Sequence, residues 1–432
     1  MILNPFVIIA VTFLLAVIIF GFSKMIGSKI EGYANAVDEF RKEGAYLRQI
    51  KLLADKYDGQ ASKRRPVTDL LADQALAPPE IEQCLVNFYS LGCRFTGYVG
   101  PFNNGYFDPE PAITYACKAG CRTFILEIDY MDDCVSEGYF PKIVVRDVQS
   151  KNQVTMSSSK PMCNSIGHSN IKEVSEAINR NAFAKHMQNS TDPVIIVLYF
   201  LRMPPSASVL EYFSNVAKGL GPLLNRHVDN LVNGGTFTRQ KQEGTLLINS
   251  ITDYEGRVLI FSNADTSIFR DSAKKYQPKE DLDYLVNLRL TYRQTKMGCT
   301  AGVTSGVYGV LEAAEDYLII PPDQTVSTQQ EIKLRWTCLL SSDPSMPVTE
   351  DTFNKVTDTY GCHCIPITLW DEKNKFMFSD KRFGKYSFIP KPVDLRYRKP
   401  MVAVPGEPSV ETDAKSGKLR TPALGLGSSG SK

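Results

Sequence analysis

Two carboxylates, Glu127 and Asp129, have the spacing that first suggests a chemical site in this chain. They end the apolar run 123–130, and residues two apart on a strand face the same side. Two like charges held close repel each other unless a cation or a hydrogen-bond donor offsets them. Arg146, near the end of the next expected strand, is the obvious internal cation. The spacing leaves two interpretations open: carboxylates held by Arg146 and loop groups, or a site for a bound cation.

Histidine is the side chain most often used for acid–base chemistry near neutral pH, and the chain has four histidines. His186 and His227 fall at expected helix ends, where a histidine more often binds the last carbonyl groups than catalyses. His363 begins the last expected strand. His168 follows the third expected strand and is the one histidine expected to reach the strand ends, so it is a weak candidate for catalysis.

The ten cysteines are scattered, without the dense spacing of a small disulfide-rich secreted protein. We therefore expect reduced thiols in a domain that faces the cytosol. Cys362 and Cys364 flank His363, which first suggests a metal site. Adjacent residues on a strand point to opposite faces, however, so the three side chains do not converge on one ion without a kink.

Apolar, strand-like runs recur at long intervals, and helical patterns lie between several of them. The strand-like runs are 93–98, 123–130, 142–148, 194–201, 257–262, 332–340 and 364–369, and the helical patterns are 111–120, 171–186 and 209–224. Strands that alternate with helices imply a parallel sheet with the helices outside. About eight strands over roughly 300 residues predict an α/β fold of the closed (β/α)8 TIM-barrel type. An open doubly wound sheet is the alternative, but it normally has a glycine-rich turn after its first strand, and none is present in the required form.

The N-terminus has no charged side chain before Lys24, and residues 6–22 read FVIIAVTFLLAVIIFGF. As a helix, this segment spans ~30 Å, the thickness of a bilayer core. No basic region precedes it and no clear cleavage site follows, which favours a retained transmembrane anchor over a signal peptide. The apolar residues taken to represent the anchor are Phe6, Ile8, Leu14 and Phe20.

Basic residues follow the anchor, at Lys24, Lys29 and Arg41, and nothing basic but the amino terminus precedes it. The positive-inside rule then predicts a single-pass membrane protein whose large domain lies on the cytoplasmic side.

The predicted organisation is an anchor at 1–23, a helical stalk at 24–84, a barrel at 85–399 and a disordered Pro-, Gly- and Ser-rich tail at 400–432. Helical periodicity in the stalk fits a helix packed on its own domain or one that binds a neighbouring chain. Hydrophobic residues make up 43% and charged residues 22%, as in globular proteins, and the formal net charge of +2 does not indicate nucleic-acid binding.

Three segments resemble, in order and spacing, the catalytic barrel of phosphoinositide-specific phospholipase C. Residues 119–129 read AGCRTFILEID, which is similar to the family's GCR stretch and its strand ending in Glu-x-Asp. Residues 173–198, with a helix, Asn-Ala-Phe, a loop and DPVII, resemble the family's fourth barrel unit. Residues 360–392, with YGCHC, GKY and PKP, resemble the end of the barrel. Together these segments cover about residues 90–399.

The resemblance implies a site in which histidine and an acid–base pair act with a calcium ion held by an asparagine and three carboxylates. Glu127 and Asp129 match two calcium ligands, and Asn103 or Asn104 could supply the asparagine. The family's histidines after the first and third strands are missing, because the chain reads YVGPFNN at 98–104 and VVRD at 144–147. Tyr199 takes the place of the family's glutamate after the fourth strand. These departures imply that the chemistry has been lost.

A narrower resemblance is to the phospholipase-C-like proteins of large nucleocytoplasmic DNA viruses, which also lack these histidines and resemble virion components. We therefore expect a membrane-anchored, catalytically inactive barrel with a structural or interaction role, as a minor capsid or inner-membrane-associated virion protein. The expected partners are the lipid bilayer, through the N-terminal helix, and other capsid or membrane proteins, with no cofactor. The alternatives are an active phosphoinositide phospholipase C, which would use Ca2+, and a lipid-headgroup-binding module without turnover.

Overall fold

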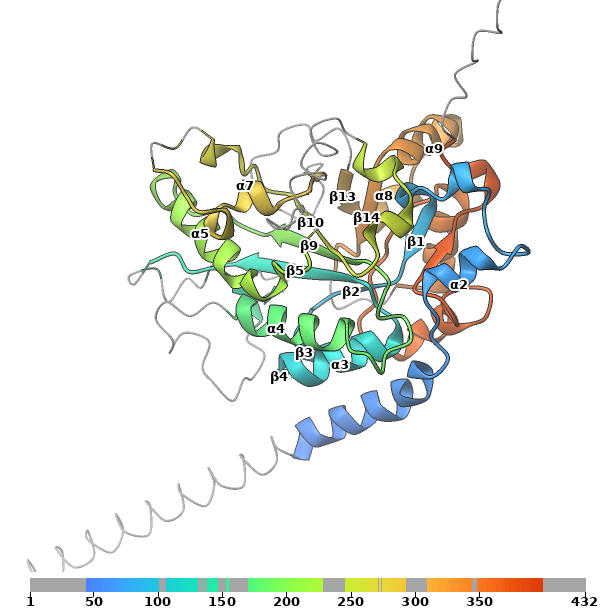
Figure 1. Ribbon diagram of the computed structural model, residues 1–432, viewed down its shortest axis with the longest axis horizontal. Coiled ribbons are helices and arrows are strands. Elements are labelled where there is room, and N and C mark those ends of the chain that lie inside the picture. The colour runs from blue at the N-terminus through green and yellow to red at the C-terminus, as the bar shows by residue number, and fades with distance from the viewer. Residues whose placement is uncertain are drawn as a thin grey trace, which may run out of the picture. The chain divides into compact units, whose positions relative to one another are not determined.

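Parallel strands form the centre of the protein (Figure 1). The computed structural model describes residues 44–100, 106–130, 135, 138–146, 153–154, 170–227, 245–270, 272, 274–292, 309–343 and 348–398. One sheet contains parallel strands in the order β11-β10-β9-β5-β2, and a second contains β12-β13-β14. The strands of the first sheet are β2 (Gly92–Cys93), β5 (Thr123–Asp129), β9 (Val194–Phe200), β10 (Val258–Ser262) and β11 (Leu288–Arg289). Those of the second are β12 (Thr291–Tyr292), β13 (Gly309–Ala313) and β14 (Trp336–Leu340).

Single parallel bridges connect both sheets to the segment 364–367. Cys93 of β2 pairs with Ile367, and Cys338 of β14 pairs with Cys364. The Ile367 N–H donates a hydrogen bond of 2.8 Å to the Gly92 carbonyl. At the other edge, β11 and β12 are separated in the chain by one residue. The assigned strands are thus two parallel sheets joined by bridges, and the predicted α/β class with a parallel sheet is confirmed.

Helices pack outside the strands (Figure 1). They are α2 (Val67–Ala72), α3 (Pro109–Ala119), α4 (Ile171–Ala182), α5 (Val209–Gly219), α7 (Leu282–Leu285), α8 (Ala314–Leu318), α9 (Thr325–Leu334) and α10 (Glu350–Asn354). In α4, the buried residues Ile171, Val174 and Ile178 recur at helical spacing and form the stripe that faces the sheet. The helix α3 has proline in its first turn and ends at Gly120, whose φ of 93° is one that glycine adopts without strain.

Side chains of the central strands alternate between two apolar clusters. On β9, Ile196 and Leu198 belong to the outer cluster between strands and helices, whereas Ile195 and Val197 belong to an inner cluster. The inner cluster also contains Phe261 of β10 and side chains of β13, β14 and the segment 364–367. Burial on both faces explains why β9 and residues 124–126 of β5 are continuous apolar runs rather than alternating ones.

The amino ends of the strands are covered by segments from both ends of the described chain. The strand β1 (Phe88–Ser90) pairs antiparallel with β15 (Phe388–Pro390). Phe88 and Phe388 both join the inner apolar cluster, together with residues of α2 and of the 3-10 helices η2 (Leu85–Asn87) and η7 (Leu246–Ile248). Residues 80–90 therefore form two short 3-10 turns and β1.

The third predicted strand, 142–148, is not a parallel strand of the sheet. Its residues form β6 (Lys142–Ile143), which is antiparallel to β5, and β7 (Val145–Arg146), which pairs with β8 (Gln153–Val154). The parallel neighbours of β5 are β2 and β9, so the unit predicted as the fourth lies directly beside the second. The reason for the error is that 142–148 has β-forming residues, and local composition does not set strand direction.

Other boundaries also differ from the prediction. The first predicted strand, 93–98, ends at Cys93 in the sheet, and residues 332–340 divide into the end of α9 and β14. The strands β11, β12 and β13 were not predicted. By contrast, the strand predictions at 123–130, 194–201 and 257–262 and the helix predictions at 111–120, 171–186 and 209–224 are confirmed, apart from residues at their ends.

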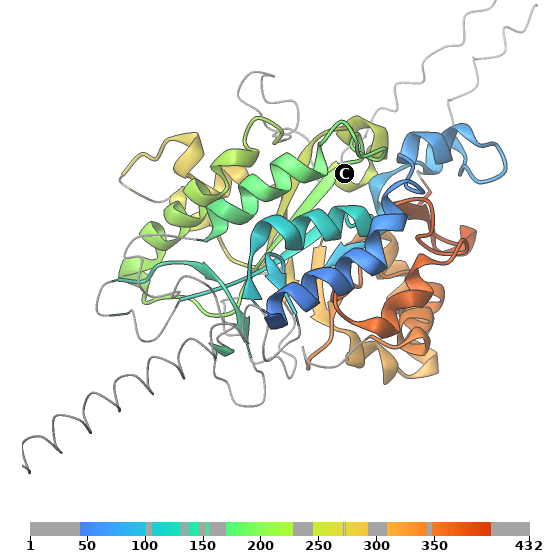
Figure 2. The ribbon, with the colours of Figure 1, turned by 90° about the horizontal axis from the view of Figure 1, so that it is seen from below.

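Residues 44–61 form a helix that lies along the domain (Figure 2). Leu53 and Tyr57 are buried in the outer apolar cluster, and Leu47 is exposed. The Lys56 ammonium donates to the Leu369 carbonyl (3.2 Å) and to the Asn374 side-chain oxygen (2.7 Å). Of the two interpretations of the stalk periodicity, packing on its own domain therefore applies to this helix.

The predicted anchor, with Phe6, Ile8, Leu14 and Phe20, lies outside the described residues, as does the predicted tail at 400–432. In the part of the chain that the structure describes, no helix combines the length and the apolarity needed to cross a membrane.

Candidate functional site at the carboxyl ends of the strands

Glu127 is part of a buried ion pair with Arg94, the residue that directly follows β2. The Arg94 Nε donates to Glu127 Oε1 at 2.6 Å, and the two side chains are 6% and 2% exposed. On β5, Glu127 lies opposite Tyr199 of β9. A charge-assisted hydrogen bond at this distance is among the stronger interactions in proteins, and here it joins the ends of neighbouring strands.

Asp129, at the end of the same strand, is paired with Arg202. The Arg202 Nε lies 2.9 Å from Asp129 Oδ1 and 3.1 Å from Oδ2. The Arg202 guanidinium also stacks over the Tyr130 ring, 4.2 Å from its centroid. Asp129 is fully buried, and its Oδ1 also accepts the Tyr130 N–H at 2.7 Å. Each carboxylate of the β5 pair therefore has its own guanidinium group.

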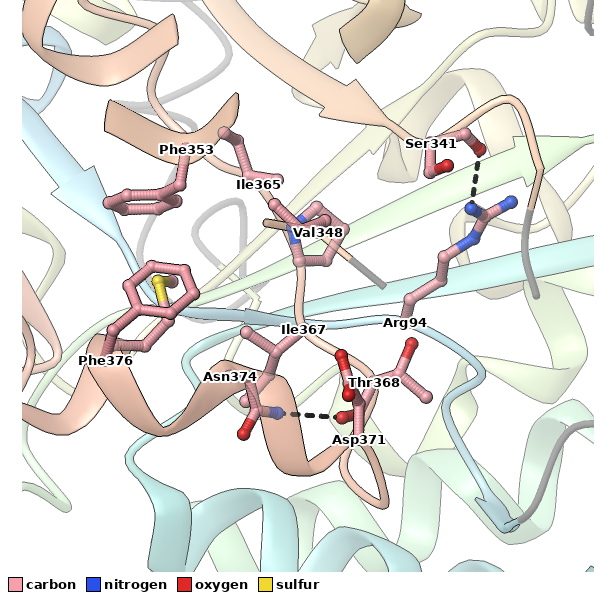
Figure 3. Close-up of a pocket in the computed structure, with 12 residues that line it drawn as sticks. Arg94, Ser341, Val348, Phe353, Ile365, Ile367, Thr368, Asp371, Asn374 and Phe376 are labelled. Carbon is pink, nitrogen blue, oxygen red and sulfur yellow. Dashed lines mark hydrogen bonds between the residues drawn. The ribbon is translucent and has the colours of Figure 1, made fainter. Parts of the chain in front are cut away.

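Arg94 also reaches the end of β14 (Figure 3). Its Nη1 donates to the Ser341 carbonyl at 2.8 Å, and its guanidinium lies 5.0 Å from the Phe95 ring centroid. The Ser341 hydroxyl in turn donates to Glu315 at 3.0 Å. One side chain thus connects β2, β5 and the residue after β14. A guanidinium offers donors and no acceptor, so Arg94 cannot remove a proton from an attacking hydroxyl.

The structure places Glu127 and Asp129 on one strand end, as the spacing predicted. Arg146 lies on β7, and the structure does not describe its side chain, so its predicted role as the internal cation stays a prediction. Asn103, Asn104 and His168 lie outside the described residues.

Sequence reasoning missed both Arg94 and Arg202. Arg94 was included in a predicted buried strand, and a buried charge inside an apolar run is a signal that it needs a partner. Arg202 was missed because the segment 142–148 was placed between β5 and the strand that Arg202 follows.

The described residues at this site do not fit calcium. Calcium takes six to eight oxygen ligands, usually several carboxylates. Here the Glu127 Oε1 and both Asp129 oxygens face arginine nitrogens. Among the residues that the structure covers, no three His, Cys, Asp or Glu side chains are placed to hold a metal ion. The positive charge at these carboxylates is supplied by the protein itself.

A small pocket lies beside Arg94 (Figure 3). Its volume is about 20 Å³, which is room for about one water molecule. Ile365, Ile367, Phe353 and Met377 contribute much of its apolar lining. Small-molecule sites are far larger and usually enclose most of the ligand surface, so this pocket does not accommodate an inositol ring.

Two of the four histidines are buried away from the carboxyl ends of the strands. The His227 Nε2 lies 2.7 Å from the Leu285 carbonyl. His363 accepts the Thr337 N–H through Nδ1 at 2.9 Å, and its Nε2 lies 2.7 Å from both the Val86 carbonyl and the Lys391 ammonium nitrogen. Both ring nitrogens of His363 are used within the protein, which agrees with the argument against a metal at Cys362, His363 and Cys364.

Lys391 gives a testable pH dependence. Burial lowers the pKa of its ammonium well below the usual value, and none of the ion pairs among the described residues includes it. The unfolded chain holds the Lys391 proton to higher pH than the folded chain, so this residue makes stability rise with pH until the ordinary lysine pKa is reached. We expect Lys391→Met to raise the melting temperature at neutral pH and to flatten its rise between about pH 7 and pH 10.

The matched control is the exposed Lys385→Met, which removes a lysine from the same part of the chain. Calorimetric melting temperatures of the three proteins across this pH range test the prediction. A Lys391→Met protein that melts below the wild type at neutral pH, or that keeps the full slope, would contradict it.

No family model matches this chain, and no curated protein matches it significantly. Solved structures do resemble it at low sequence identity. The PLC21 structure from L. pealei is 15% identical, with a TM-score of 0.48, over 77% of this chain and 41% of that one. The PLC21 structure from S. officinalis is 16% identical, with a TM-score of 0.45, over the same shares. A calcium-dependent phosphoinositol-specific phospholipase C from the Gram-negative bacterium Pseudomonas sp is 11% identical, with a TM-score of 0.40, over 73% of this chain and 97% of that one. The chain therefore spans about two fifths of the length of the two PLC21 proteins.

Proposed function

We propose that this protein is a catalytically inactive phospholipase-C-like barrel with a structural or interaction role. The observation that carries the proposal is the buried Arg94–Glu127 pair. Glu127 belongs to the Glu-x-Asp motif through which the sequence resembles the phospholipase family. In that resemblance the carboxylate serves a calcium ion, whereas here its oxygen accepts a hydrogen bond from a guanidinium at 2.6 Å.

The proposed architecture is a closed (β/α)8 barrel made of the parallel strands and the segment 364–367. Three observations support it. The bridges at Cys93–Ile367 and Cys338–Cys364 continue the pairing on both sides of this segment. The strands β11 and β12 are nearly continuous in the chain. The inner apolar cluster collects one face of the strands from both sheets, as the filled interior of such a barrel requires.

After the first strand, where the resemblance implies a histidine and an asparagine, the sequence reads YVGPFNN at 98–104 and contains no histidine. Tyr199 faces Glu127 from β9, at the position where the resemblance implies a glutamate. General acid–base catalysis contributes about 10²–10⁴-fold per positioned group, so a site lacking these groups loses most of its rate. The missing acid–base groups support a structural or interaction role rather than catalytic turnover.

The proposal extends to the setting of the domain. The uncharged segment 1–23, represented by Phe6, Ile8, Leu14 and Phe20, would anchor it in a membrane with the large domain on the cytoplasmic side. The resemblance to proteins of large DNA viruses supports a place at the inner membrane or capsid of a virion. The partners would be the bilayer and other capsid or membrane proteins, without a cofactor and without nucleic acid.

We expect the full-length protein to release no inositol phosphate from vesicles that contain phosphatidylinositol phosphates, with or without calcium. The reason is that the sequence lacks the histidines that the resemblance implies after the first and third strands. Release of inositol phosphates is measured against an active phospholipase C under the same conditions. Calcium-dependent release that His168→Ala abolishes would establish the alternative, an active phosphoinositide phospholipase C.

A further inference from the structure

The sequence contains one Asn-x-Ser/Thr triplet in which x is not proline, Asn189-Ser190-Thr191. This triplet is the acceptor for N-linked glycosylation, and a modified asparagine belongs to a surface loop of a secreted protein. Asn189 is 0% exposed, although Thr191, two residues later, is exposed. The acceptor asparagine therefore lies inside the protein.

Both the side chain and the backbone hold Asn189 in this position, shortly before β9. The side-chain Nδ2, which is the atom that glycosylation modifies, donates to the Ser387 hydroxyl at 2.8 Å. The Asn189 carbonyl accepts the Asp192 N–H at 3.1 Å and a hydrogen bond from the Arg122 guanidinium. Ser387, Asp192 and Arg122 are themselves fully buried. A group added at Nδ2 therefore has to displace the residues that enclose it.

N-glycosylation adds a group that this position cannot hold. An oligosaccharide passes from a lipid-linked pyrophosphate donor to the amide: the bond from the sugar C1 to the pyrophosphate oxygen breaks, a bond from C1 to Nδ2 forms, and Nδ2 loses one proton. The lipid pyrophosphate is the leaving group. The added chain of sugars is bulky and polar, and protein interiors are close-packed, with few voids larger than a water molecule. A glycosylated Asn189 therefore cannot take its place in this fold.

The order of the chain decides which event comes first if the domain crosses a membrane. Ser387, which receives the Nδ2 hydrogen bond, lies 198 residues beyond Asn189. A chain that enters a lumen with its N-terminal part leading presents Asn189 to the transferase before Ser387 has crossed. The triplet is therefore modified before the fold can bury it.

We propose that glycosylation and burial of Asn189 exclude each other, so that this domain folds only on the side of a membrane that lacks the glycosylation machinery, which is the cytosolic side. The assignment of the side rests on the membrane setting in the proposed function, but it does not use the charges around the segment 1–23. The exclusion also defines a modification site: in a lumenal chain, Asn189 carries an oligosaccharide and the domain stays unfolded.

The test inverts the full-length chain during translation in the presence of endoplasmic-reticulum membranes. Lys24→Glu and Lys29→Glu, with three lysines added after Met1, reverse the charge difference that orients the anchor. An Asn-Ser-Thr tag after the C-terminus reports which side the domain has reached. We expect no glycan on the chain in its own orientation. We expect the inverted chain to carry two, at the tag and at Asn189, and to lose the protease-resistant core.

Thr191→Ala is the matched control, because it destroys the triplet and leaves Asn189 in place. In the chain's own orientation, this variant should melt within about 2 °C of the unsubstituted protein, since Thr191 is exposed. In the inverted chain it should carry the tag glycan alone and regain the protease-resistant core. A cleavable signal peptide in place of residues 1–23 delivers the domain to the lumen by a second route, with the same expectations.

Three outcomes in a lumenal domain would overturn the exclusion. They are an Asn189 glycan on a chain as protease-resistant as Thr191→Ala, a chain modified at the tag and not at Asn189, and a Thr191→Ala chain that stays unfolded. Glycans on the chain in its own orientation would overturn the cytosolic placement. Hydrolysis of phosphoinositides would overturn the proposed function and leave all these results unchanged, so the two failures are distinguishable.

Discussion

Replacing Glu127 with alanine is expected to lower the free energy of unfolding by about 3–5 kcal/mol, because the substitution leaves the buried Arg94 guanidinium without its carboxylate. The charge cannot move to solvent easily, since Nη1 is held by the Ser341 carbonyl and the guanidinium packs on Phe95. Urea unfolding of the full-length protein, followed by circular dichroism, measures the change.

The control is a double variant in which both charges are removed, Arg94→Met with Glu127→Leu. Replacing a buried ion pair by apolar side chains of similar size is often neutral or stabilising, so this protein should recover most of the loss. A double variant as unstable as Glu127→Ala would show that the cost comes from the lost volume or strand packing and not from an unpaired charge.

The second large effect is expected at Gly120, which follows α3. Its φ is 93°, and a Cβ atom there would lie 2.8 Å from the Cζ and Nε atoms of Arg64. Arg64 is fully buried and donates to the Phe383 carbonyl, so it has little room to retreat. A left-handed conformation costs an L residue about 1–2 kcal/mol, and displacement of a buried side chain adds to that, so Gly120→Ala should cost about 3 kcal/mol or more.

Gly59 provides the matched control for this substitution. It lies in the helix 44–61, and a Cβ atom there would have no neighbour within 4 Å. Gly59→Ala should therefore stabilise the protein by about 0.5–1 kcal/mol through helix propensity. Equal effects of the two alanine substitutions in urea unfolding would argue against the contact between Gly120 and Arg64.

The long central elements could be predicted from sequence, and the short ones could not. The strand β9 is apolar along its whole length and β5 is apolar from Phe124 to Leu126, because both faces of these strands are buried, and this makes them visible in the sequence. The strands β2 and β11 have two residues each, too few for any periodicity. Only Ile332 is buried in α9, so this helix has almost no apolar stripe, and its end was assigned to the following strand.

The carboxylates of the site could be predicted and their partners could not. The positions of Glu127 and Asp129 on one side of β5 follow from the period of a strand, which is a local property. The pairing of Arg202 with Asp129 depends on which strand lies beside β5, and this is decided by tertiary packing. To predict Arg94 as a residue of the site, the end of β2 had to be placed to within one residue. Element boundaries are the least certain part of a sequence-based assignment.

The attachment of the helix 44–61 to the segment after the last parallel strand has a consequence for the order of folding during synthesis. Lys56 binds the Leu369 carbonyl, 313 residues further along the chain, and β1 pairs with β15 at Phe88 and Pro390. A ribosome adds about 5–20 residues per second, so roughly 15–60 s pass between the synthesis of such partners. Until then Tyr57 lacks the Leu369 carbonyl to which its hydroxyl donates and Phe88 lacks its strand partner Pro390, and contacts this distant in sequence form slowly. The nascent chain must therefore keep its earliest apolar segments from aggregating until its last strands have been made.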